Sequence, residues 1–144
     1  MEQIYVFANR EDSLNIFNDN AGGRFRVYFP NPYVLEGTWE CPLLEVTFVP
    51  KLTTPTRRIY AICDFVENYY VRDSYIPVLQ SLNALNEDAT DVTFENPIYH
   101  RVRDGIGQHI EISMRDDNLE IIRFKEDHVF CLVHFRRKKK KRSR

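Results

Sequence analysis

The chain has 144 residues, of which 43% are hydrophobic and 13% are aromatic. This length suits one domain with its own core, and the apolar content excludes a wholly disordered chain. No run approaches the roughly 20 consecutive apolar residues that cross a bilayer, and residues 1–5 lack the basic and apolar parts of a signal peptide. We therefore expect no membrane insertion.

The formal net charge of −1 conceals an uneven distribution of charge along the chain. Residues 1–135 hold 12 Lys and Arg against all 21 Asp and Glu, so this predicted domain has a charge of about −9. The last nine residues carry eight positive charges: Arg136, Arg137, Lys138, Lys139, Lys140, Lys141, Arg142 and Arg144. Without apolar side chains, residues 136–144 are predicted to be a disordered tail that engages a negative partner, namely nucleic acid, anionic lipid or an acidic groove.

Two-residue periodicity predicts strands in the first half of the domain. Phe25, Val27 and Phe29 alternate with more polar residues, and residues 59–63 form a continuous apolar run that suits a strand covered on both faces. Residues 39–48 change their apolar phase at Pro42. Because proline removes a backbone donor, we expect a β-bulge or an edge position there.

The second half has one ambiguous segment and three further strands. Residues 75–85 could form a short helix with Pro77 in its first turn, although a strand followed by a loop fits nearly as well. Strands are predicted around 92–94, 110–115 and 129–135, with Gly, Pro, Asn and Asp between the runs. The pattern indicates an all-β domain over residues 1–135, a β-sandwich of roughly jelly-roll size with about eight antiparallel strands.

Few residues indicate catalysis or metal binding. The glycine pairs lack the spacing and lysine of a phosphate-binding loop, and no serine stands in a nucleophile elbow. His100, Asp104 and His109 could hold a metal around one loop, but we favour a polar loop with two exposed imidazoles. We therefore expect no enzyme activity, no cofactor and no metal site.

Two acidic segments have structural interpretations. Asp64 follows an apolar run, and we expect it to pair with Arg57 or Arg58. Asp116 and Asp117 could be half of a pair of carboxylates for acid–base chemistry, but we favour a turn that satisfies its own backbone.

The cysteines and tyrosines also have two interpretations each. Cys41, Cys63 and Cys131 lie in apolar segments, and their odd number favours buried core thiols in a reducing compartment over disulfides. The tyrosines could stack on nucleic acid bases or anchor a subunit interface. We favour the interface because the domain is acidic. The residues considered are Tyr28, Tyr33, Tyr69, Tyr70, Tyr75 and Tyr99.

Seven segments in order resemble one family of viral proteins. The segments are 25–30 (FRVYFP), 35–46 (LEGTWECPLLEV), 59–67 (IYAICDFVE), 75–79 (YIPVL), 94–99 (FENPIY), 110–117 (IEISMRDD) and 134–137 (HFRR). Together they resemble the penton, or minor capsid, proteins of Polinton/Maverick elements and the related adintoviruses. The chain departs from the family pattern at Pro42, where a small apolar residue is usual, and at residues 48–50, where Tyr-Pro is usual.

The resemblance implies a single jelly roll that assembles as a homopentamer at the five-fold vertices of an icosahedral capsid. Its neighbour would be a double-jelly-roll major capsid protein, and its locations the virion capsid and, during assembly, the host nucleus. The basic tail is not part of the shared pattern. It could contact packaged DNA non-specifically, act as a nuclear import signal, do both, or be a solvated, solubilising terminus with no partner. The alternative function is a small nuclear nucleic-acid-binding β-barrel module.

Overall fold

The computed structural model of the protein describes residues 3–9, 11, 16–21, 23–28, 38–48, 56–71, 73–83, 90–103, 109–124 and 129–138. All regular elements in these ranges are β-strands paired in antiparallel ladders, as the sequence predicts. The described residues contain no helix, and hence none long and apolar enough to cross a membrane.

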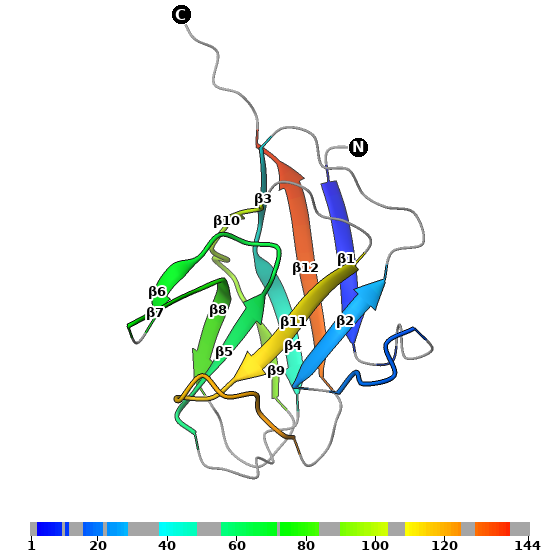
Figure 1. Ribbon diagram of the computed structural model, residues 1–144. Helices are drawn as coiled ribbons and strands as arrows, with labels where there is room; N and C mark the ends of the chain where they lie inside the picture. Colours follow the sequence, from blue (N-terminus) through cyan, green and yellow to red (C-terminus); the bar gives the residue numbers. More distant parts are fainter. Residues whose placement is uncertain are drawn as a thin grey trace, which may run out of the picture.

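The larger sheet has six strands and lies at the back of the molecule in Figure 1. Its last strand in sequence is central, because β12 pairs with β1 along one side and with β4 and β3 along the other. Two short strands complete it, β9 beside β4 and β10 beside β3. The bounds are β1 (Gln3–Asn9), β3 (Trp39–Cys41), β4 (Leu43–Phe48), β9 (Thr90–Thr93), β10 (His100–Arg101) and β12 (Phe130–Arg137).

The second sheet has the strand order β2-β11-β5-β8 and crosses in front of the first (Figure 1). Its strands are β2 (Arg24–Tyr28), β5 (Arg58–Cys63), β8 (Val78–Asn83) and β11 (His109–Arg115). A separate hairpin of β6 (Tyr69–Val71) and β7 (Ser74–Ile76) lies between β5 and β8 in the chain and projects from one side of the molecule.

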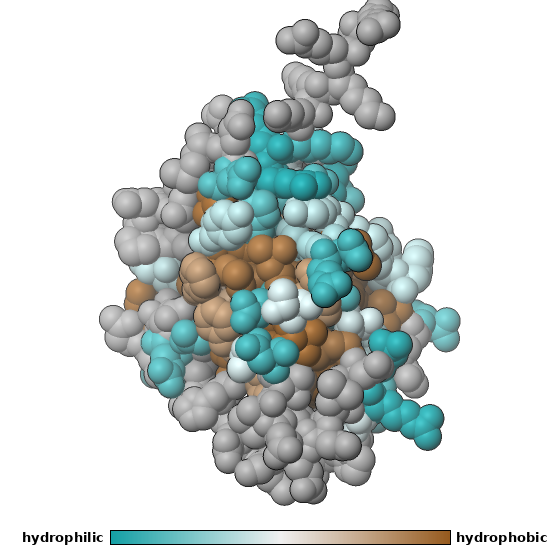
Figure 2. Space-filling view, turned by 180° about the vertical axis from the view of Figure 1, so that it is seen from behind, coloured by the Kyte–Doolittle hydropathy of each residue, from teal (hydrophilic) through white to brown (hydrophobic). Residues whose placement is uncertain are grey.

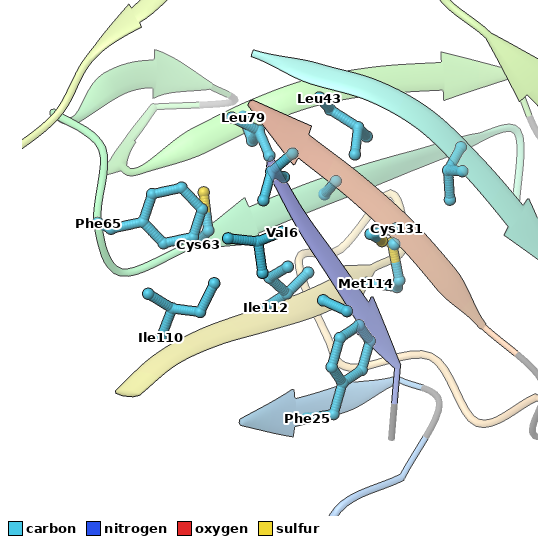
Figure 3. Close-up of a cluster of buried hydrophobic side chains, with 14 of the residues drawn as sticks. Val6, Phe25, Leu43, Cys63, Phe65, Leu79, Ile110, Ile112, Met114 and Cys131 are labelled. Atoms are coloured by element: carbon cyan, nitrogen blue, oxygen red, sulfur yellow. The ribbon is translucent and has the colours of Figure 1, made fainter. Parts of the chain in front are cut away.

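One hydrophobic core lies between the two sheets. Alternate residues of each strand point inward, so Val6 and Cys131 of the six-stranded sheet face Phe25 and Ile112 of the four-stranded sheet (Figure 3). The three cysteines are free and buried in this core, as predicted; they are Cys41, Cys63 and Cys131. Burial raises the pKa of the Cys131 thiol to about 12, so this thiol is uncharged at neutral pH.

Pro42 interrupts one line of the six-stranded sheet. It separates β3 from β4, and the register of β12 against β4 shifts between Leu132 and Val133, so Leu44 has no residue opposite it. The predicted β-bulge is therefore present, but it lies beside the central strand and not at a sheet edge. The Pro42 carbonyl still accepts a hydrogen bond from the His134 backbone N–H at 3.4 Å.

The helix considered for residues 75–85 is wrong over the described residues 75–83, which form β7 and β8. The register of β8 against β5 shifts between Ala61 and Ile62, which leaves Leu79 as an extra residue in β8. A bulge at that point places apolar residues three apart at Leu79 and Leu82, and this spacing imitates a helical pattern.

Candidate functional site

The histidines considered for a metal site have separate surroundings. His100 lies in β10 of the six-stranded sheet, whereas His109 lies in β11 of the other sheet and packs its ring 5.5 Å from that of Phe17. Asp104 is outside the described residues. Among the residues that are described, no group of three His, Cys, Asp or Glu side chains could hold a metal ion.

His100 is buried, which corrects our expectation of an exposed imidazole. Its Nε2 lies 2.7 Å from the Leu79 carbonyl oxygen, and Nδ1 is buried without a hydrogen-bond partner. A carbonyl can only accept, so Nε2 carries the proton and the ring is neutral in this arrangement. Burial lowers the pKa of His100, and the bond to Leu79 opposes that change only in part. The residue is a structural link between β10 and β8.

The acidic residues singled out from the sequence also have structural partners. Asp64 Oδ1 accepts a hydrogen bond from the Glu111 backbone N–H at 2.9 Å, so the expected pairing with Arg57 or Arg58 is wrong. Burial raises the pKa of the Asp64 carboxyl group. The backbone N–H groups of Arg57 and Arg58 donate to Asp117 instead, at 2.8 and 3.2 Å.

The turn predicted after β11 is present. Asp116 Oδ1 accepts hydrogen bonds from the backbone N–H groups of Asn118 and Glu120, at 2.9 and 3.0 Å. Its neighbour Asp117 joins this turn to the start of β5, a long-range contact that sequence spacing did not indicate.

The first residues of the predicted tail belong to the folded domain. Arg136 and Arg137 are the last residues of β12 and pair with Glu40 and Trp39 of β3. Arg136 Nε lies 2.6 Å from Glu40 Oε1, and its guanidinium carbon lies 3.3 Å from the centre of the Tyr99 ring. These contacts neutralise Arg136 and hold it on the sheet, so the boundary expected after residue 135 is displaced.

The next two residues of the tail stay beside the segment at residues 38–39. Arg137 and Lys138 are exposed, and the Lys138 backbone N–H donates to the Thr38 carbonyl at 2.8 Å. Five predicted binding residues lie outside the described residues, namely Lys139, Lys140, Lys141, Arg142 and Arg144. The tail therefore begins at one end of β12, where the paired strand β1 also begins.

The predicted tyrosine surface is found on the β6–β7 hairpin. Tyr70 and Tyr75 are a cross-strand pair with ring centres 4.8 Å apart, and they are 81% and 58% exposed. Tyr69 lies edge-on to His100 at 4.9 Å and fixes the base of the hairpin against β10. Tyr28 and Tyr99 are half-buried, and Tyr33 is outside the described residues.

A second aromatic surface, on β1, was missed in the sequence. Tyr5 and Phe7 point outward from this strand and are 56% and 60% exposed. Tyr5 stacks on His134 at 4.3 Å, and the Phe7 ring lies 5.8 Å from that of Phe130. Figure 2, which views the molecule from behind, shows apolar residues gathered across the middle of this side. The alternation of Ile4, Val6 and Ala8 with these aromatic residues was the available signal.

The sequence matches no known protein-family profile, and no curated protein matches it.

Proposed function

We propose that the chain is a structural capsid protein, a single jelly-roll penton subunit that forms homopentamers at icosahedral five-fold vertices. The observation that carries this proposal is the order in which the chain visits the two sheets. It adds to the resemblance of seven ordered segments between residues 25 and 137 to penton proteins of Polinton/Maverick elements and adintoviruses.

The strand order supports a jelly roll once the interrupted strands are joined. β3 and β4 are successive parts of one interrupted strand beside β12. β9 and β10 are likewise two parts of the next strand, because β9 pairs with β4 and β10 pairs with β3. Counted in this way, each sheet has four strands. The larger sheet has the order β1, β12, β3/β4, β9/β10, and the second sheet has the order β2, β11, β5, β8. Apart from β5 and β8, which lie in the same sheet, strands that follow one another in the sequence alternate between the two sheets. This is the order produced by two Greek keys folded together.

The exposed aromatic residues support subunit contact. Tyrosine and phenylalanine bury large areas at low cost in side-chain entropy and are enriched at the centres of protein interfaces. Tyr70 and Tyr75 on the hairpin and Tyr5 and Phe7 on β1 are surfaces of this kind. A double-jelly-roll major capsid protein is the expected neighbour of the assembled ring.

Native mass of the purified full chain tests this function. We expect a five-subunit species by native mass spectrometry and by light scattering. Rings visible by electron microscopy would confirm the symmetry. A chain that stays monomeric at all concentrations, also with the major capsid protein added, would contradict the proposal.

The tail supplies non-specific DNA contact or a nuclear import signal in this proposal. Truncation after Lys138 removes five positive charges and keeps the strand contacts of Arg136. We expect it to weaken duplex DNA binding and to reduce the salt slope of the affinity by up to about 4, because each phosphate contact releases about 0.9 of a counterion. Thermal stability is the control and should not change. Undiminished DNA binding by the truncated chain would contradict this role.

The alternative, a nuclear nucleic-acid-binding module, rests on the exposed Tyr70–Tyr75 pair. Exposed aromatic rings such as these can stack on single-stranded bases. In the chain truncated after Lys138, this alternative predicts that Tyr70→Ala weakens binding to single-stranded DNA. The capsid proposal predicts that the truncated chain does not bind single-stranded DNA, with or without this substitution.

A further inference from the structure

The two exposed aromatic surfaces lie at opposite edges of the six-stranded sheet. β1 forms one edge and pairs only with β12, whereas β10 lies at the far side of β3. The β6–β7 hairpin extends from this second edge, because Tyr69 packs on His100 and Glu67 donates its backbone N–H to the Arg101 carbonyl at 3.0 Å. Figure 1 places β1 and the hairpin on opposite flanks of the molecule.

Within the described residues, the β1 edge has none of the features that usually protect an exposed strand from pairing. Natural edge strands are usually blunted by charged side chains, proline or a bulge. The seven residues of β1 include no charge and no proline, and their register against β12 is unbroken from Gln3 to Asn9. The outward Tyr5 and Phe7 add apolar area beside this intact edge. Such a strand is suited to a partner that supplies backbone and aromatic contacts.

The hairpin has matching properties. The residues of β6 and β7 carry no charge, the Tyr70–Tyr75 pair is exposed, and within the described residues these strands pair only with each other. The turn is tight, with Asp73 at a φ of 64°. The strands of both surfaces are thus neutral and aromatic, so their contact buries no strand charge without a partner, and the charge of Asp73 lies in the turn beyond them.

We propose that these two surfaces are the two halves of one contact between copies of this chain: the β6–β7 hairpin of one subunit packs against β1, Tyr5 and Phe7 of the next. This inference rests on the proposed ring. A cyclic ring needs a head-to-tail contact between two different surfaces on each subunit. Surfaces at opposite edges of one sheet meet this need, and each subunit then covers its neighbour's open edge.

Two charge substitutions and their mixture test the contact. Phe7→Lys places a charge on the β1 surface, and Tyr70→Lys places one on the hairpin, both at well-exposed positions. Ile121→Lys is the matched control, because Ile121 is 43% exposed and belongs to neither surface. Native mass is measured for the wild type, for each variant and for an equimolar mixture of the first two. Circular dichroism melting curves establish that every variant is folded.

We expect five-subunit rings from the wild type and from Ile121→Lys, and monomers from Phe7→Lys and Tyr70→Lys. The mixture should form two-subunit species only, because it retains one intact hairpin and one intact β1 surface per pair. Rings that persist in either single variant overturn this contact and leave the penton proposal standing, as does a mixture that remains monomeric. A wild-type chain that never forms rings overturns both.

Discussion

The first two strands of the chain are both sheet edges, but they expose different kinds of side chain to solvent. β2 presents Arg24 and Arg26, whose Nε atoms lie 2.8 and 3.2 Å from Glu111 Oε1 on the neighbouring strand. β1 presents Tyr5 and Phe7, with no charged residue anywhere in the strand.

The difference indicates which edge meets a partner. Guanidinium groups on β2 remain hydrated and discourage another strand from pairing there, as is usual for a free edge. Covering the uncharged aromatic residues on β1 removes apolar surface from water and therefore lowers the free energy. In the proposed ring, β2 remains at the surface and β1 is covered by the neighbouring subunit.

The largest expected effect is a difference in stability loss between substitutions of an inward and an outward phenylalanine on these two strands. Phe25 of β2 is fully buried, so Phe25→Ala should lower the free energy of unfolding by about 3–5 kcal/mol. Phe7→Ala should lower it by less than about 1 kcal/mol, because that ring is mostly in water. Both are measured by urea denaturation in a Tyr70→Lys background that keeps the chain monomeric. Equal losses would mean that Phe7 is a core residue.

A smaller effect is expected from the ion pairs that blunt β2. Glu111→Gln removes the charge that both arginines share and should cost about 1 kcal/mol, more at low salt than at high salt. Asp19→Asn is the control. Asp19 is 3.7 and 3.6 Å from the same arginines and well exposed, so its loss should be under about 0.5 kcal/mol. A salt-independent loss for Glu111→Gln would mean that packing, and not charge, holds this edge.

The smallest effect concerns the edge of the six-stranded sheet that lies opposite β1. There His100 of β10 is hydrogen-bonded to Leu79 of β8. Its pKa is lowered by burial, so the unfolded chain binds a proton more readily than the folded chain. Stability should be complete above the ordinary histidine pKa of about 6.5 and should fall as the pH drops below it.

His100→Gln keeps an N–H for the Leu79 carbonyl and cannot titrate, so its stability should depend less on pH between 7.5 and 5.5 than that of the wild type. Some dependence remains because burial and the Arg136 charge lower the pKa of His134 as well. Denaturation curves at the two pH values measure the slope. An unchanged slope would show that His100 does not titrate in this range.

Much of the fold could be predicted because a strand buried on one face shows its period in the sequence. β2, β5, β11 and β12 were found by alternation or by continuous apolar runs. The sequence left the segment of β8 open between a helix and a strand because a bulge at Leu79 breaks its period, and such a bulge is visible only when the partner strand is known. β1 was missed although its alternation is clean, because its outward residues are aromatic and not polar.

The functional residues were harder to predict, since contacts across strands far apart in sequence decide them. Nothing near Arg136 indicated that Glu40, 96 residues away, would hold it on the sheet. The sequence likewise paired Asp64 with its neighbours, whereas the fold brings it to Glu111. Of the tyrosines considered from the sequence, those on the hairpin are exposed, whereas Tyr28 and Tyr99 are half-buried, and the sequence offered no means of separating the two groups.

The position of β12 has a consequence for synthesis of the chain. β12 leaves the ribosome after the other described strands, yet it pairs with β1, β3 and β4 and fills the centre of its sheet. Until residues 130–137 emerge, these three strands lack their central partner, so the sandwich closes only after β12 has been made. We therefore expect slow folding dominated by long-range pairing, and no stable product from messages truncated before β12. In the proposed ring, only chains that include β12 would be able to assemble.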